Sequence, residues 1–338
     1  MSHSTADAEL ILATPAQQAE RWGHHFAQWG AGYERSLFLR REAALAESEF
    51  GRSQLKLWLW VEPNGQVLAS CETYAGNAWY CDDVGRTSIE PLQAVASVLV
   101  VPELRGQGHA AAMMAALSVE LRALGTTVST LFSDVGPNLY RKAGYLLHPA
   151  RETALAVSGP HAMPAGAVEL GLGDLADVLA RDREELGAWV GGSTAPALAE
   201  IVQVDRIAWF ATRARYRAWA RGTEPSPVLG VAVGDSFCLW TTDAAEPLLH
   251  VLAWRPRRPA DADKMVQAAL AHASDLGLRQ VLFWDADRDT GLDPWRRAAV
   301  QPPGLHRARD TGLPMLAWLQ KGRPMPLVWM GIERYTWC

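Results

Sequence analysis

Residues 96–125 read ASVLVVPELRGQGHAAAMMAALSVELRALG. An apolar run passes into a short turn, and Gly106 and Gly108 then precede a stretch rich in Ala, Met and Leu. This order predicts a buried strand, a loop and a helix over 107–124. The first amides of such a helix lack intrahelical partners, and the helix dipole attracts anions to them. Because glycine has no Cβ to block a phosphate, and Arg105 adds a positive charge, the loop is a candidate phosphate site.

Three rival loop types make different demands on the sequence. A Walker loop needs Lys followed by Ser or Thr after its last glycine, whereas His109 and Ala110 stand there. A dinucleotide-binding loop needs three glycines with their own spacing, which are absent. An ordinary tight turn needs nothing more than one or two glycines. For an isolated pair of glycines the tight turn is the better interpretation, so the surrounding residues decide.

Those surroundings resemble the GCN5-related N-acetyltransferases. Residues 105–110, Arg-Gly-Gln-Gly-His-Ala, are similar to that family's acetyl-coenzyme A signature, and PNLYRKAGY at 137–145 looks like its FYxxxGF segment. The resemblance implies acetyl-CoA as co-substrate, without a metal, and Tyr140 as the general acid that protonates the departing thiolate. It implies that the strand residues Val98, Leu99 and Val100 present backbone groups to the pantetheine arm. The residues implied to hold the pyrophosphate are Arg105, Gly106, Gln107, Gly108, His109, Ala110 and Ala111.

A narrower resemblance concerns the acceptor. The segments ASCETY (69–74), 95–114, 131–145 and the terminal ERYTWC (333–338) look like the lysine N-acetyltransferases of yeasts and their relatives. This implies direct transfer of the acetyl group to a primary amine, with the ε-amine of free L-lysine as the expected acceptor. Two alternatives stay open, because a fold fixes neither acceptor nor activity. One is acetylation of an amine-bearing antibiotic or toxin, and the other is a non-catalytic CoA-binding sensor or interaction protein.

Amine acetylation requires an ammonium group to lose a proton, so a carboxylate base is expected. Glu72 stands within a predicted strand, where it faces either a site or solvent. The terminal carboxylate of Cys338 follows an apolar segment and is the competing candidate, unless that terminus packs for stability alone. Tyr74 and Asp134 are expected to contact the acceptor together with Glu72, although Asp134 has the alternative role of beginning a turn. The pair His24-His25 is assigned a structural role, because a metal site would need further ligands.

Two halves are predicted from the rest of the chain. Residues 1–156 form an acetyl-CoA-binding domain, 157–168 a linker rich in Gly, Pro and Ala, and 169–338 a degenerate acetyltransferase-like domain that completes the acceptor site. In the first half, Thr14 and Pro15 mark a helix start. In the second, strands and helices follow one another again, with a helix expected over Pro196–Trp219. The predicted fold class is therefore mixed α/β in a tandem arrangement.

Composition limits the partners of the chain. Of 338 residues, 49% are hydrophobic and 20% charged, which is typical of a well-cored globular protein. A net charge of −5 with scattered basic residues argues against nucleic acid and anionic membranes as partners. The 15 tryptophans are assigned mostly to the core. Four cysteines without close pairing, and no secretory signal, lead us to expect a cytoplasmic protein with reduced thiols and a small-molecule amine partner. The oligomeric state stays open.

Overall fold

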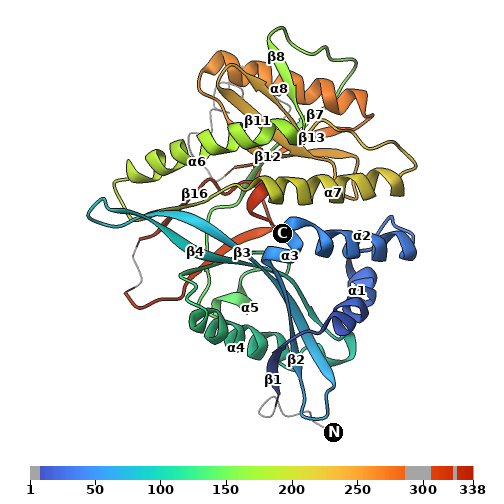
Figure 1. Cartoon of the computed structure of the whole chain (residues 1–338), viewed down its shortest axis with the longest axis vertical. Coiled ribbons are helices and arrows are strands. Elements are labelled where there is room, and N and C mark those ends of the chain that lie inside the picture. Colours follow the sequence, from blue (N-terminus) through green and yellow to red (C-terminus); the bar gives the residue numbers. More distant parts are fainter. Residues whose placement is uncertain (1–7, 286–305, 323–325, 338) are drawn as a thin grey trace.

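The computed structural model of the chain describes residues 8–285, 306–322 and 326–337 (Figure 1). These residues form two mixed β-sheets with helices packed on them. The mixed α/β class predicted from the sequence is confirmed. None of the helices in these three ranges is both long and apolar enough to cross a lipid bilayer.

The first sheet carries the predicted cofactor loop. Its strand order is β1-β2-β3-β4-β5-β15-β6, and β9 and β16 extend it beside β3. The strands are β1 (Glu9–Leu12), β2 (Leu55–Val61), β3 (Val67–Cys81), β4 (Thr87–Val100), β5 (Val128–Ser133), β6 (Leu146–Leu147), β9 (Ala197–Glu200), β15 (Leu313–Trp318) and β16 (Val328–Met330). Strands β1 to β4 pair antiparallel, whereas β4 and β5 run parallel. A parallel pair needs a crossover, which the helix after the loop provides.

Helices pack on both sheets and on one another. They are α1 (Pro15–Trp29), α2 (Arg35–Glu47), α3 (Glu49–Gln54), α4 (His109–Ala123), α5 (Asn138–Arg141), α6 (Leu175–Gly191), α7 (Val204–Ala220) and α8 (Pro259–Asp275), with single 3-10 turns η1 (Pro102–Leu104), η2 (Leu172–Asp174) and η3 (Arg334–Thr336). Helix α4 packs on β1, β3 and β4, and α7 contacts α2, α3 and β11. Figure 1 shows α7 beside α2, between the two sheets. The start of α1 is as predicted, because the Thr14 side chain accepts a hydrogen bond from the Gln17 amide.

The second sheet has the order β14-β7-β13-β12-β11-β10-β8. Its strands are β7 (Arg151–Ala156), β8 (Ala167–Leu170), β10 (Gly230–Val233), β11 (Ser236–Thr241), β12 (Leu248–Arg255), β13 (Gln280–Asp285) and β14 (His306–Ala308). Each sheet includes strands from the other side of the predicted linker: β7 joins the second sheet, whereas β9, β15 and β16 join the first. The division of the chain at 157–168 stays a prediction.

One expected helix is wrong at its start. Residues 197–200 form strand β9, and α7 begins only at Val204. The segment Ala-Leu-Ala-Glu has good helix propensity, but all four side chains are buried. It pairs with the long end of β3 on one side and with β16 on the other. These pairings satisfy its buried backbone groups, so tertiary contact overrides propensity here. The end of the predicted linker similarly becomes strand β8, which pairs with β10.

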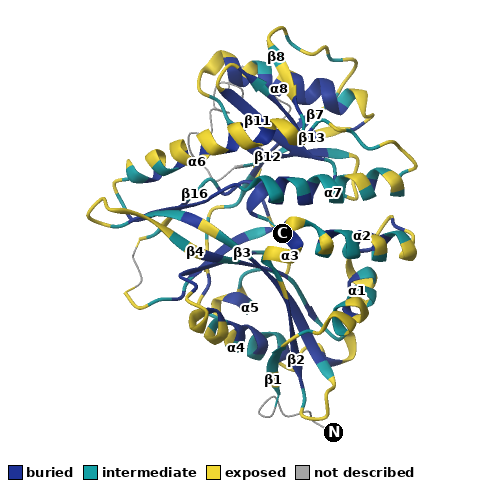
Figure 2. Cartoon of the chain, in the orientation of Figure 1, coloured by how far each residue is buried: buried dark blue, intermediate teal, exposed yellow. Residues whose placement is uncertain are grey.

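The largest core cluster spans both sheets. It includes Tyr74 of β3, Trp209 of α7, Leu239 of β11, Leu252 of β12 and Tyr335 of η3. Figure 2 shows the buried residues concentrated in the strands of the two sheets. Six tryptophans are buried in the described cores: Trp58, Trp60, Trp209, Trp240, Trp254 and Trp329. Trp79, Trp318 and Trp337 pack partly buried against them, whereas Trp29, Trp189 and Trp219 are exposed. One continuous core therefore holds the two sheets against each other.

Candidate active site

The glycine loop between η1 and α4 has open space around its backbone. Gly106 and Gly108 have φ values of +79° and +90°, in the left-handed region that glycine tolerates best. A Cβ built at either position would meet no atom of the described chain within 4 Å. Helix α4 begins at His109, and its first helical hydrogen bond runs from the Ala112 amide to the Gly108 carbonyl. The preceding amides of α4 are therefore available to a ligand in this space.

A hollow of about 310 Å³ lies directly against the loop. Arg105 and Lys142 line it together with the start of α4, which suits an anionic group. Of the predicted pyrophosphate residues, six line this hollow: Arg105, Gly106, Gly108, His109, Ala110 and Ala111. Gln107 does not, and its side-chain amide instead donates to the Glu103 carbonyl at 3.4 Å. Sequence reasoning missed Lys142, although its place two residues after Tyr140 was a usable signal.

The imidazole of His109 points into the protein. The residue is 1% exposed, and neither ring nitrogen has a hydrogen-bond partner among the described residues. Its contribution to the loop is therefore its backbone at the first turn of α4, as the sequence suggested.

Strands β4 and β5 separate before β4 ends and the glycine loop begins. Their pairing ends at Val95 and Leu131, whereas β4 continues to Val100. A bulge accompanies the separation, and Ser97 has φ +52°, the one positive value among the described non-glycine residues. The Ser97 hydroxyl donates to Glu72 at 2.8 Å, which helps to hold this conformation. The edge of β4 that faces β5 is thus open over the predicted pantetheine residues Val98, Leu99 and Val100.

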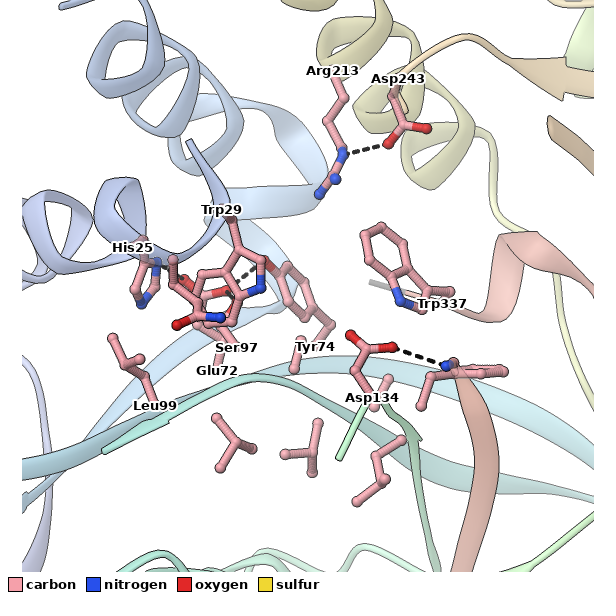
Figure 3. Close-up of a pocket in the computed structure, with 18 of the residues that line it drawn as sticks. His25, Trp29, Glu72, Tyr74, Ser97, Leu99, Asp134, Arg213, Asp243 and Trp337 are labelled. Atoms are coloured by element: carbon pink, nitrogen blue, oxygen red, sulfur yellow. Dashed lines mark hydrogen bonds and ion pairs between the residues drawn. The ribbon is translucent and has the colours of Figure 1, made fainter. Parts of the chain in front are cut away.

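A cavity of about 680 Å³ continues from this opening into the space between the sheets. Val98, Leu99, Val100 and Tyr140 line it on the side of the glycine loop. Both predicted halves contribute to its wall, because α1, β3, α7, β13 and η3 all place side chains in it. Figure 3 shows the side predicted to bind the acceptor, where His25 of α1, Glu72 of β3 and Ser97 of β4 lie across the open space from Trp337.

Glu72 of β3 is buried in this wall with an exposed fraction of 5%. Its Oε2 accepts hydrogen bonds from the Tyr74 hydroxyl at 3.2 Å and from Ser97 at 2.8 Å. The alternative that Glu72 lies on a solvated strand face is therefore wrong. His25 Nδ1 lies 3.9 Å from Glu72 Oε1, so an imidazole stands beside the carboxylate (Figure 3). The arrangement can accept a proton from a bound ammonium at Glu72.

His25 was assigned a structural role from the sequence, but it lines the cavity with Trp22 and Trp29 of the same helix. These residues are spaced by three and four positions, so they share one face of α1. The His25 ring contacts Trp29 edge-on, with ring centroids 5.2 Å apart. The spacing of these three residues was the available signal that His25 faces the same way as the two tryptophans. The same spacing is equally typical of an apolar stripe packed in a core.

Tyr140 is 6% exposed and lies on α5, against the opening between β4 and β5. Burial raises the pKa of its hydroxyl well above the usual value. The hydroxyl is therefore protonated at neutral pH and can donate a proton or a hydrogen bond into the cavity. Nearby Tyr145 is a different case, because its hydroxyl is already bonded to Ser129 Oγ at 2.6 Å.

Asp134 follows β5 and lines the cavity opposite Glu72 (Figure 3). Its Oδ1 accepts the Gly312 amide at 2.8 Å, so the residue joins the end of β5 to the segment before β15. The other predicted acceptor residue, Tyr74, is buried next to Glu72 and stacks on Phe50. Cys338, the competing base, lies outside the described residues.

Residues of the second half supply a charged cluster that sequence reasoning missed. Arg213 Nε contacts Asp243 Oδ2 at 2.7 Å, and both residues line the cavity. Burial opposes ionisation of Asp243, but Arg213 and Arg334 together lower its pKa to about 2. His250 lies in the same wall, and burial followed by the charge of Arg334 lowers its pKa to about 3. No local motif marks these residues, because they come from separate elements. Among the described residues, no group of three or more His, Cys, Asp or Glu is placed to hold a metal ion.

Residues 154–338 match the family described as LYC1 GNAT-like C-terminal domain, where GNAT denotes GCN5-related N-acetyltransferases. This match covers more than half of the 338 residues. The chain belongs to this GNAT family. The matched residues lie after the glycine loop, so the family match and the loop signature are separate observations. No curated protein sequence matches the chain.

Solved GNAT structures share the fold of the whole chain. A GCN5-related N-acetyltransferase from Kribbella flavida is 18% identical, with a TM-score of 0.58 over 93% of this chain and 72% of that one. One from Anabaena variabilis is 14% identical, with a TM-score of 0.53 over 93% of this chain and 73% of that one. A tandem GNAT protein from the clavulanic acid biosynthesis pathway is 14% identical, with a TM-score of 0.52 over 94% of this chain and 100% of that one. The two-sheet architecture is thus a tandem GNAT fold.

Proposed function

We propose that this protein is an N-acetyltransferase that moves the acetyl group of acetyl-CoA directly to a primary amine. One observation carries the proposal. A single cavity extends from the residues next to the glycine loop, along the open edge of β4, to the buried carboxylate Glu72. A long thioester on one side and a small amine on the other can meet in such a space.

The loop residues would hold the cofactor. Backbone amides at the start of α4, with Arg105 and Lys142, would bind the pyrophosphate. The open edge of β4 over residues 98–100 would accept hydrogen bonds from, and donate them to, the amide groups of the pantetheine arm. The fit rests on the empty space above Gly106 and Gly108, which any side chain at these positions would fill.

The residues of the cavity would move the protons. Glu72 takes a proton from the acceptor ammonium, directly or through water, and His25 beside it offers a further acceptor on the way to solvent. The neutral amine attacks the thioester carbonyl, so that a C–N bond forms and the C–S bond breaks. Tyr140 donates its proton to the departing thiolate and recovers one from solvent. The terminal carboxylate of Cys338 is the competing base.

The acceptor we propose is the ε-amine of free L-lysine, on the strength of the sequence resemblance, with the protein acting in the cytoplasm. Glu72, Tyr74 and Asp134 would contact it. A polycation such as an aminoglycoside would favour an acidic cavity wall, whereas Arg213 and Arg334 add positive charge to this one. We therefore rank an amine-bearing antibiotic or toxin as the second candidate acceptor. A CoA-binding sensor without turnover is the remaining alternative.

The test is free-thiol release from acetyl-CoA with a panel of amines, using the parent protein, Glu72→Gln and Glu90→Gln. Glu90 is a matched control, because it also accepts hydroxyl hydrogen bonds in the first sheet, from Ser88 and Thr127, and is not part of the cavity wall. We expect lysine-dependent release, reduced on the order of a hundredfold or more by Glu72→Gln and within a few-fold by Glu90→Gln.

Thiol release that no amine stimulates, in a protein that still binds CoA by calorimetry, would support the sensor instead. If Glu72→Gln keeps the parental rate, Glu72 is not the base, and removal of residue 338 becomes the next test.

A further inference from the structure

A buried guanidinium lies at the acceptor end of the cavity, and the described chain supplies it with no ion-pair partner. Arg334 of η3 is 7% exposed and lines the cavity. Its Nε is shielded from solvent and has no hydrogen-bond partner within residues 8–285, 306–322 and 326–337. Burying a charge without a partner is costly, so native proteins rarely retain one unless a ligand or a partner group balances it.

The nearby carboxylates are already engaged. Asp243 is paired with Arg213 at 2.7 Å, and Asp134 accepts the Gly312 amide at 2.8 Å. Neither forms an ion pair with Arg334 in the described parts of the chain, although both act on it electrostatically. Burial is the main reason that the pKa of Arg334 is lowered, to about 9. The side chain is therefore still cationic at neutral pH and can bind an anion.

The surrounding structure fixes the position of this cation. Its guanidinium lies 3.5 Å from the ring centre of Trp337 and 4.8 Å from that of Trp284. The turn that carries it is anchored directly after Arg334, because Tyr335 donates to the Glu200 carbonyl at 2.7 Å and Arg206 donates to the Thr336 carbonyl at 3.0 Å. Contact with two indoles restrains the guanidinium, and its planar donors suit bidentate binding of a carboxylate.

The cation and the proposed base belong to different sides of the cavity. Figure 3 shows Trp337, on which Arg334 stacks, across the open space from Glu72 and His25. A ligand that reaches both sides must carry an amine at one end and an anionic group at the other, with a spacer between them. Asp134, on the side of Trp337, is exposed, and because the Gly312 amide uses only its Oδ1, its other oxygen can accept from a second ammonium group.

We propose that Arg334 binds the carboxylate of the acceptor and thereby selects amino acids with a side-chain amine over amines that lack a carboxylate. The inference rests on the proposed function, and it adds the group that recognises the acceptor's far end. Arg334 is a specificity residue and not a proton carrier, so its loss should raise the KM of a carboxylated acceptor more than it lowers kcat.

The experiment compares kcat/KM for L-lysine with that for cadaverine, which is lysine without its carboxylate. Removing one partner from a hydrogen bond between charged groups costs on the order of tenfold to a hundredfold in affinity. We expect the parent protein to prefer lysine by about this factor, and Arg334→Gln to reduce the preference to within a few-fold while cadaverine turnover changes little. L-Norleucine, which has the carboxylate but no side-chain amine, should compete with lysine in the parent and not in Arg334→Gln.

Arg309→Gln is the matched control. Arg309 is also buried and lies 3.8 Å from the ring centre of Trp284, but it is not part of the cavity wall. It should keep the lysine preference whatever its effect on stability. CoA binding by calorimetry and circular dichroism establish that each variant is folded. If Arg334→Gln does not fold, Arg334→Met replaces it, because its apolar stem can still pack on Trp337.

Three outcomes would overturn the inference: equal use of cadaverine and lysine by the parent, a preference retained without Arg334, or a preference lost equally in Arg309→Gln. A failure of the proposed function looks different, since no amine would then release thiol. In that case calorimetry of L-norleucine with the CoA-saturated protein decides. If the parent binds L-norleucine and Arg334→Gln does not, the carboxylate site is supported. If the parent does not bind L-norleucine, or if Arg334→Gln binds it equally well, the carboxylate site is refuted.

Discussion

At the scale of single residues, similar side chains take different roles because of their surroundings. Tyr140 and Tyr145 are five positions apart, and burial raises the pKa of both hydroxyls. Tyr145 is bonded to Ser129 inside the core, whereas Tyr140 lines the cavity beside the open edge of β4. Only Tyr140 can therefore reach a ligand. The position of the side chain, and not the pKa of its hydroxyl, distinguishes the proposed acid Tyr140 from the structural Tyr145.

This contrast makes a paired prediction. Tyr140→Phe should bind CoA as the parent does and lose on the order of a hundredfold in turnover, because the thiolate then leaves without a proton donor. Tyr145→Phe should keep most of its turnover and lose about 1 kcal/mol in free energy of unfolding, the net contribution of one hydrogen bond. Steady-state rates and denaturant unfolding measure the two effects. Turnover of Tyr140→Phe within a few-fold of the parent would make Tyr140 structural.

At the scale of elements, the two ends of helix α4 each carry a glycine with positive φ. Gly108 precedes the helix with φ +90°, and Gly125 follows it with φ +80°. Neither would bring a Cβ within 4 Å of an atom in the described chain. The two substitutions to alanine should therefore strain the apoprotein similarly, by about 1 kcal/mol. They differ in that only Gly108 borders the hollow at the loop.

Gly108→Ala should accordingly weaken CoA binding by tenfold or more, since the new methyl group occupies the proposed pyrophosphate space. Gly125→Ala should leave the CoA affinity within about twofold of the parent. Its melting temperature should fall by about as much as that of Gly108→Ala. Calorimetric titration with CoA and thermal unfolding separate binding from stability. Equal affinities in the two variants would place the pyrophosphate elsewhere.

At the scale of the whole molecule, the two sheets are interlocked. Strand β15 supplies the partner of β5 in the first sheet, and η3 and α7 close the cavity over it. The core that contains Tyr74 also contains Trp209 and Tyr335. The glycine loop and the opposite wall of the cavity are therefore held in fixed positions by contacts between residues far apart in the sequence.

A fragment of residues 1–156 tests this dependence. Without β15 it would expose the edge of β5 and the apolar surface that packs against α7, and an unpaired apolar edge favours aggregation. We expect the fragment to be insoluble or unfolded, and co-expression with 157–338 to restore a complex that binds CoA. Size-exclusion chromatography and circular dichroism are the measurements. A monomeric, folded fragment that binds CoA would show that the first half folds independently.

Part of this architecture follows from interactions between residues close together in the sequence. Three features depend only on residues a few positions apart: the cap at Thr14, the strand alternation around residues 55–81 and the glycine loop before α4. A left-handed turn needs glycine, and a helix start leaves free amides, wherever the chain then goes. For this reason local sequence predicts the loop and helix start that border the hollow, although it does not indicate Lys142, which also lines it.

The acceptor side depended on the tertiary structure. Strand β9 was predicted as helix because its propensity is helical, and only its pairing with β3 and β16 overrides that tendency. His25, Arg213 and Arg334 have no period or spacing in common, and long-range packing alone brings them to one cavity. The sequence by itself thus determined the glycine loop with its free helix-start amides and the α/β class, since short-range chemistry governs both. Tertiary structure decided which side chains line the cavity beside that loop, because burial and charge pairing depend on a side chain's neighbours in space.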